Sequence, residues 1–259
     1  MILYADDIRF DYSIFTSDIK IHSIKPESYD ASISLSNTDI KGTLDISKLR
    51  VKSLKLDNVF ANSINAYNTK FITKPIISDF RVSDIVNFNH TSFEKGLDLD
   101  DAYFSGTTFF NGITLSSSLY DNSCSAATYC MIKDSLDKSG NTIEANKYFA
   151  LEMDKLYSEL KWHKNFPEKL LLSINKCSSN FGQNWWLPIV WMIGFASLFY
   201  CLREYDPFDY PCLNGIASFI IPYQGIIGES HQMSKLLTSL LFGVLIYQTT
   251  VALKRKTRR

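Results

Sequence analysis

The apolar residues of the first half of the chain recur every five positions. Two such series are offset by two residues: Leu44, Leu49, Leu54, Val59 and Ile64, and then Ile46, Val51, Leu56, Ala61 and Ala66. Each quintet therefore holds two apolar positions around one polar position, which is the alternation of a β-strand. A period of five fits neither a helix nor one long strand. It predicts a chain that turns a corner every five residues, in coils stacked roughly 4.8 Å apart.

The pattern slips after residue 66 and then resumes. The resumed pairs are Val86/Phe88, Thr91/Phe93, Leu97/Leu99, Ala102/Phe104 and Thr107/Phe109. This register predicts a core that contains Leu49, Leu54, Leu56, Phe88, Phe93, Leu99, Phe104 and Phe109. Phe110 is one residue out of phase and is expected to face outward. An antiparallel β domain with accidental spacing is the alternative.

A small or apolar residue stands two positions before a central Phe in Thr91-Ser-Phe93, Ala102-Tyr-Phe104 and Thr107-Thr-Phe109. This motif resembles the pentapeptide-repeat family. The resemblance implies a β-solenoid, a right-handed quadrilateral helix of repeats. We place it at residues 1–120, with the best repeats at 40–115.

The composition changes after residue 120, where good helix formers predict an amphipathic helical hairpin over 121–166. One helix is expected at 125–138, with Gly140 as its stop. Asn141 with Glu144 resembles a capping box for the second helix. The hairpin either caps the open end of the solenoid or mediates self-association.

Two segments of 18 residues, 185–202 and 236–253, contain no charged residue. At about 1.5 Å per residue each reaches about 27 Å, close to the hydrocarbon thickness of a bilayer. They predict two transmembrane helices in a domain spanning 185–259, preceded by an interfacial linker at 167–184. Ser239 and Gly243 lie four residues apart and predict a helix-packing face.

The run from Glu144-Ala145 to Trp185-Trp186 resembles bacterial membrane proteins in which pentapeptide repeats precede a hairpin and two spanning helices. Lys and Arg number 27, as do Asp and Glu, but a basic cluster ends the chain. By the positive-inside rule, this cluster is a cytoplasmic anchor and both termini are cytoplasmic, in a multi-pass protein of the bacterial inner membrane. The cluster comprises Lys254, Arg255, Lys256, Arg258 and Arg259.

The loop between the two predicted spans is acidic near its ends and apolar over 213–228. Pro and Gly interrupt the apolar part, which either lies on the outer interface or enters the membrane as a pore element. The residues of the pore alternative are Pro222, Tyr223, Gln224, Gly225 and Gly228.

Common catalytic and cofactor-binding motifs are absent from the sequence. The chain has no HExxH, GxSxG, P-loop, CxxC or dinucleotide fingerprint. The four histidines and five cysteines are scattered. We therefore expect no enzyme, no catalytic residues, no cofactor and no metal.

The leading hypothesis is a non-enzymatic, membrane-anchored binding or scaffold protein that presents a cytoplasmic β-solenoid. Its expected partners are the lipid bilayer, a protein on the solenoid face and a second copy of the chain. The alternative is an oligomeric ion channel or membrane-permeabilising effector. A topoisomerase-binding DNA mimic is the third hypothesis, which the net charge of −4 over residues 1–121 does not favour, so nucleic acid is not an expected partner.

Overall fold

The computed structural model describes residues 2–4, 7–22, 31–115, 124–202 and 232–257. The chain divides into two compact units, Met1–Glu152 and Met153–Arg259, which we call the solenoid unit and the helical unit. The division falls inside one helix, Thr142–Glu159.

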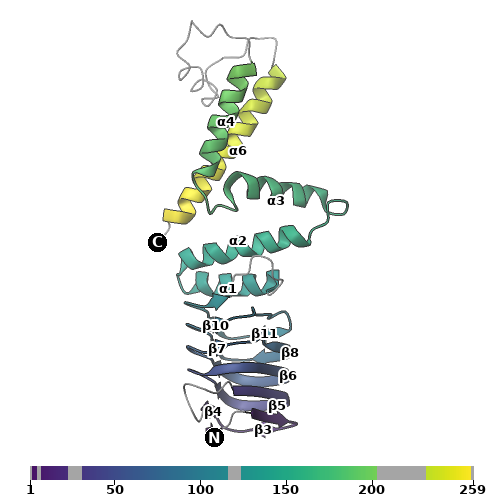
Figure 1. The fold of residues 1–259 in the computed structure, drawn as a ribbon, viewed down its shortest axis with the longest axis vertical. Coiled ribbons are helices and arrows are strands. Elements are labelled where there is room, and N and C mark those ends of the chain that lie inside the picture. The colour runs from purple at the N-terminus through teal and green to yellow at the C-terminus, as the bar shows by residue number, and fades with distance from the viewer. Residues whose placement is uncertain (1, 5–6, 23–30, 116–123, 203–231, 258–259) are drawn as a thin grey trace. The chain divides into compact units, whose positions relative to one another are not determined.

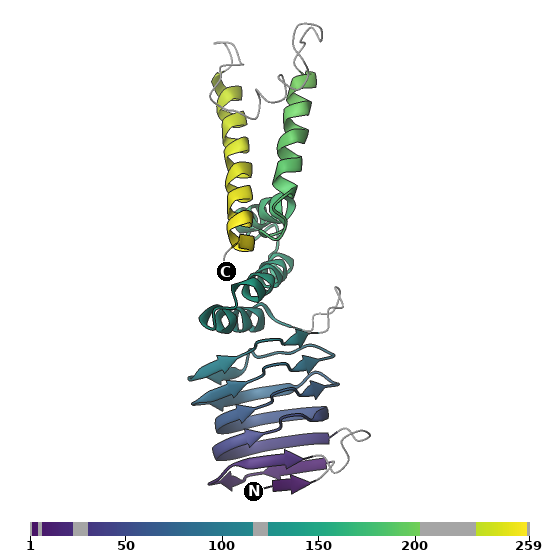
Figure 2. The same ribbon diagram turned by 90° about the vertical axis from the view of Figure 1, so that its left-hand side faces the viewer.

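The solenoid unit is a stack of parallel strands, coil upon coil (Figures 1 and 2). It forms a β-solenoid of about five turns, consistent with a repeat family. The strands described are β1 (Ile2–Tyr4), β2 (Asp7–Asp11), β3 (Ile14–Phe15), β4 (Ile19–His22), β5 (Ala31–Asp45), β6 (Arg50–Asn65), β7 (Lys70–Phe71), β8 (Ile76–Val82), β9 (Ile85–Asn87), β10 (Ser92–Phe93), β11 (Ala102–Phe104), β12 (Thr107–Phe109) and β13 (Thr114–Leu115).

The register of the strands shows how the five-residue period builds a coil. Ile33 pairs with Leu54, 21 residues on, and Ile64 pairs with Val86, 22 residues on. Four sides of five residues account for 20 positions, and the remainder are insertions. Both apolar series between Leu44 and Ala66 are buried. Each coil covers its neighbour's interior, so the core is continuous along the stack.

Aromatic rings stack between successive coils of this core. The rings of Phe71 and Phe93 lie 4.8 Å apart and nearly parallel, and those of Phe88 and Phe110 lie 5.5 Å apart. Leu49, Leu54, Leu56, Phe88, Phe93 and Leu99 are all buried, as the sequence register predicts.

The predicted register is wrong at the last coil. Phe110 is fully buried, whereas Phe109 is only partly buried and Phe104 packs partly buried against the core. For Phe109 and Phe110 the reason is a second insertion at Ser105-Gly106, which stacks on the earlier one at Ser83-Asp84. The amide of Thr107 donates to the carbonyl of Asp84 at 2.8 Å. A Cβ on Gly106 would lie 1.7 Å from that carbonyl oxygen, so only glycine allows the two insertions to stack.

Polar residues occupy the corners of the coils. Lys48, Asn68 and His90 have positive φ angles and follow one another at the same corner. Beside them, the Asn65 amide donates to Asp45 Oδ1 at 3.1 Å and the Asn87 amide donates to Asn65 Oδ1 at 3.0 Å. Burial acts to raise the pKa of Asp45, but hydrogen bonds from Ser47 and the charge of Lys20 outweigh it, so this pKa lies below its usual value.

Helices α1 (Ala126–Lys138) and α2 (Thr142–Glu159) follow the last coil. Ser125 caps α1 by accepting from the Thr128 amide at 3.0 Å. Asn141 and Glu144 interact reciprocally. The backbone amide of Glu144 donates to Asn141 Oδ1, and the side-chain amide of Asn141 donates to Glu144 Oε2. The α1 side chains Ile132 and Leu136 are buried in the solenoid core, so α1 closes this end of the stack.

The helical unit contains α3 (Phe166–Ser179), α4 (Leu187–Leu202) and α6 (Gln232–Thr257). The predicted interfacial linker is therefore largely helix α3. A tight turn with positive φ at Asn180, Phe181 and Gly182 leads towards α4. Trp191 Nε1 donates to the Cys177 carbonyl at 3.0 Å, and Ser179 donates to Gln248 at 3.0 Å, which ties α3 to α4 and to α6.

In the part of the chain that the structure describes, no helix combines the length and apolar character needed to cross a membrane. The spans predicted at 185–202 and 236–253, and with them the multi-pass inner-membrane location, have no support from the structure. Helix α4 has 16 residues, fewer than the roughly 20 that a span requires. Helix α6 has 26 residues, with Lys235 near its start and the basic residues 254–256 near its end.

The predicted packing face of Ser239 and Gly243 is not buried among the described residues. Phe242, Leu245 and Ala252 of α6 are buried, whereas Ser239 and Gly243 are exposed. A Cβ on Gly243 would meet nothing within 4 Å. Ser239 and Gly243 are therefore not covered by another described part of the chain, whereas larger apolar side chains of α6 are buried.

Other predictions fall outside the described residues. These are the loop between the predicted spans, including Pro222, Tyr223, Gln224, Gly225 and Gly228, and the last two anchor residues, Arg258 and Arg259. Of the remaining anchor residues, Lys254 and Lys256 are exposed. Arg255 Nη1 instead donates to the Phe181 carbonyl at 2.7 Å.

Candidate binding surface on the solenoid wall

One outward column of the solenoid wall contains large side chains where polar residues are expected. Asp39 pairs with Phe60, Phe60 with Arg81, and Arg81 with Tyr103 on successive strands. We call these four residues the wall column. Phe60 is 41% exposed and Tyr103 is 58% exposed. Because side chains alternate between the faces of a strand, these positions face away from the core.

Arg81 is held in place by its neighbours. Its Nε donates to Asp79 Oδ1 at 2.7 Å and its Nη2 donates to Asp79 Oδ2 at 3.2 Å, a bidentate pair. The guanidinium carbon lies 5.0 Å from the centre of the Phe60 ring and 5.8 Å from that of Tyr103. Cation–π attraction to both rings therefore orders three flat groups along the stack.

A groove runs beside the wall column. Its other side carries the polar side chains of Asn62, Ser83 and Ser105, and its volume is about 250 Å³. Asn62 is itself fixed, because its amide donates to the Lys41 carbonyl and its Oδ1 accepts from Ser83 at 3.4 Å. The groove thus offers apolar faces on one side and hydroxyl and amide groups on the other.

These residue types suit recognition of another protein. Exposed Tyr, Phe and Arg are enriched in the centres of protein interfaces, where they bury large areas with little loss of entropy. The wall beneath them is rigid, because β5, β6 and β8 are each hydrogen-bonded to strands of the coils on either side. The described residues contain no group of three or more His, Cys, Asp or Glu side chains that could hold a metal ion.

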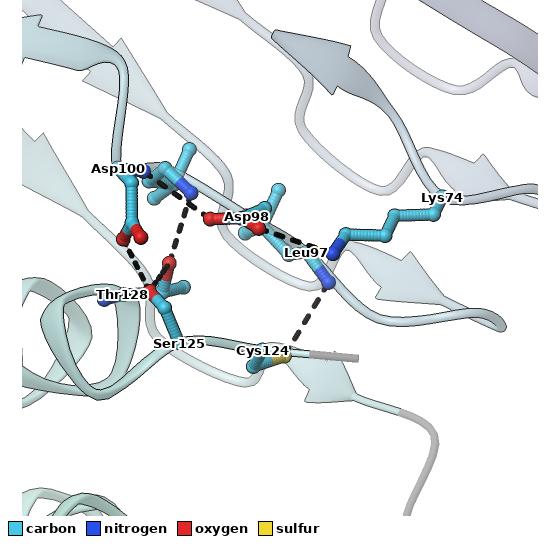
Figure 3. A network of polar contacts seen from close by, with 8 residues as sticks. Lys74, Leu97, Asp98, Asp100, Cys124, Ser125 and Thr128 are labelled. Carbon is cyan, nitrogen blue, oxygen red and sulfur yellow. Dashed lines mark hydrogen bonds and ion pairs between the residues drawn. The ribbon is translucent and has the colours of Figure 1, made fainter. Parts of the chain in front are cut away.

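A second polar cluster lies where α1 meets the solenoid (Figure 3). The Leu99 amide donates to Thr128 Oγ1 at 2.9 Å, and the Leu97 amide donates to Cys124 Sγ at 3.4 Å. Ser125 donates to Asp100, and Lys74 pairs with Asp98 at 3.1 Å. This cluster supplies hydrogen-bond acceptors for two backbone amides of the last coil, so its role is structural.

A third group links α1 to α2. Lys133 Nζ lies 2.9 Å from Glu152 Oε2, and both side chains are largely buried, 19% and 11% exposed. Burial acts to lower the pKa of Lys133, but the hydrogen bond and charge of Glu152 raise it above its usual value. Burial, and then the charge of Glu152, raise the pKa of the neighbouring Cys130 thiol, which disfavours the reactive thiolate.

The five-residue pattern did not predict the wall column, because it identifies only the positions that face the core. The signal was nevertheless present: Phe60, Arg81 and Tyr103 recur at outward positions 21 and 22 residues apart. No family model, curated protein or solved structure matches this chain, so the fold and the binding surface rest on its own residues.

Proposed function

We propose that the protein is a non-enzymatic binding or scaffold protein that works at a lipid bilayer. In this proposal the solenoid unit presents the wall column to a protein partner, and the helical unit attaches the chain to the membrane. The observation that carries it is the apolar exterior of the helical unit.

The two long helices of this unit expose several large apolar side chains. Within α4, Val190, Trp191, Ile193 and Leu198 are between 42% and 51% exposed. Within α6, Leu240 is 64% and Tyr247 is 66% exposed. Apolar patches of this kind mark contacts with a membrane or partner, because water penalises them.

The positions of the tryptophans support a lipid bilayer as the surface that the helical unit contacts. All four tryptophans of the chain lie in the helical unit, and Trp185 and Trp186 are exposed just before α4. Trp and Tyr gather at membrane–water interfaces, where the ring is apolar and the N–H or O–H remains wet. Insertion of these side chains at an interface does not require a helix that crosses the bilayer.

Flotation of the full-length chain with phospholipid vesicles tests the proposal. We expect the chain to float with the vesicles and Ile193→Glu to reduce the floating fraction, because a carboxylate cannot enter the apolar region without a large cost. Ile14→Glu is the matched control, since Ile14 is 71% exposed in the solenoid unit and should float like the wild type. A chain that stays with the unbound protein at every lipid concentration would refute the proposal.

A further inference from the structure

The two lysines of helix α3 are turned towards the protein. Lys169 Nζ donates to the Leu160 carbonyl at 2.6 Å and lies 4.8 Å from the Tyr157 ring centre and 5.6 Å from that of Trp162. Lys176 Nζ also lies 4.8 Å from the Tyr157 ring and pairs with Asp154. Both lysines therefore contact the residues that precede α3 in the chain.

The apolar side of α3 faces outward. Phe166, Leu170 and Ile174, spaced four residues apart, are 55%, 41% and 49% exposed, and the adjacent Leu171 is 64% exposed. A helix on a protein surface normally has the opposite arrangement, with its apolar stripe on the core. The inversion indicates that a partner covers this side of α3.

Charge narrows the choice of partner. The described residues of the helical unit include nine Lys or Arg and three Asp or Glu. Lys161 and Lys164, just before α3, are exposed, as are Lys254 and Lys256 at the end of α6. A second copy of the chain would bring the same positive charge against this side, whereas an anionic lipid surface attracts it.

We propose that α3 is an interfacial helix that binds anionic phospholipid. Its four exposed apolar side chains insert between the headgroups, and the flanking Lys161 and Lys164 reach the phosphates, since long basic side chains keep their charged ends at the interface. This inference rests on the proposed attachment to a membrane and adds the lipid class and the helix that selects it.

The test compares vesicles of phosphatidylcholine alone with vesicles that also contain phosphatidylglycerol, using the full-length chain. We expect binding to the mixed vesicles to be at least about tenfold tighter, because each lysine near an anionic surface adds attraction. This preference should fall as salt is raised. Equal affinity for both kinds of vesicle would overturn the inference while leaving membrane attachment intact, whereas binding to neither would refute both.

Two variants separate the apolar and electrostatic contributions. Leu171→Glu should lose binding to the mixed vesicles, and Leu151→Glu is its control, because Leu151 is 42% exposed on α2 in the solenoid unit. The double variant Lys161→Gln, Lys164→Gln should lose the preference for phosphatidylglycerol and keep the weaker binding to phosphatidylcholine. Wild-type affinity of Leu171→Glu, with unchanged circular dichroism, would exclude α3 as the binding helix.

Discussion

The solenoid unit and the helical unit differ in how far they bury their apolar side chains. Between Leu44 and Ala66 of the solenoid, every apolar residue of the two five-residue series is buried. In the described part of α4, by contrast, Ala196 is the fully buried hydrophobic residue, while four larger ones are exposed. The solenoid therefore supplies its own apolar environment from the coil above and the coil below. Among the described residues, the helical unit leaves much of its apolar surface uncovered.

The contrast shows how each unit is stabilised. A solenoid coil gains free energy only when its neighbours cover it, and the last coil is covered by α1. The helical unit is held together by a few specific contacts, such as Trp191 with the Cys177 carbonyl and Arg255 with the Phe181 carbonyl. Its four tryptophans make fluorescence a reporter for this unit alone, so the two units can be followed separately.

The largest expected effect is in the solenoid core. Phe110→Ala removes a fully buried ring that stacks on Phe88 and should cost about 3–5 kcal/mol of unfolding free energy. Phe109→Ala should cost clearly less, because its ring is only partly buried. Denaturation followed by circular dichroism in the β region measures both, and equal losses would contradict the insertion at Ser105-Gly106.

The second-largest effect is expected from a variant that tests the close approach of two coils. Gly106→Ala places a Cβ against the Asp84 carbonyl, so the backbone must move at a cost of about 3 kcal/mol. Gly194→Ala in α4 is the control, since nothing lies within 4 Å of its Cβ. That change should stabilise the helix by about 1 kcal/mol. If both variants melted alike, the stacked insertions would not exist as described.

A smaller effect is expected between α1 and α2. Lys133→Met removes the cation beside the largely buried Glu152 and should cost about 2 kcal/mol. Because folding raises the pKa of Lys133, its contribution is complete below about pH 10 and is lost as the pH rises through the folded pKa. The stability difference from wild type should therefore shrink in alkaline solution. The exposed Lys138→Met, on the same helix, should show little change at any pH.

The smallest effect is expected on the wall. Asp79→Asn breaks the exposed pair with Arg81 and should change the unfolding free energy by less than about 1 kcal/mol. Asn also tolerates the positive φ of this corner, so the backbone is not strained. The difference in melting temperature from wild type should vanish at high salt. A loss as large as that of Phe110→Ala would mean that the wall column is part of the core.

Local patterns made much of the solenoid predictable. Apolar residues two apart, repeated every five, can be buried together only if the chain turns a corner each time. The alternation of Leu54 and Leu56 therefore already implied strand, turn and stacking. The start of α1 at Ser125 and of α2 after Asn141 followed in the same way, because capping depends on residues within one turn.

The register of the last coil was not predictable by extending the five-residue period. An insertion adds one residue without changing composition, and only the stacking of Ser105-Gly106 on Ser83-Asp84 shows that Phe110, not Phe109, turns inward. The wall column is likewise a tertiary feature, since Phe60, Arg81 and Tyr103 meet only when coils of 21 and 22 residues lie in register.

In the helical unit the sequence by itself determined that the segments around α4 and α6 are apolar and helical. The tertiary structure decided which side chains of α6 are covered, burying Phe242 and Leu245 and leaving Gly243 exposed. It also decided that the lysines of α3 face Tyr157 while Leu171 faces outward. The physical reason is that the composition of a segment determines how much apolar surface it has. Which of its side chains are covered depends on how neighbouring helices pack against it.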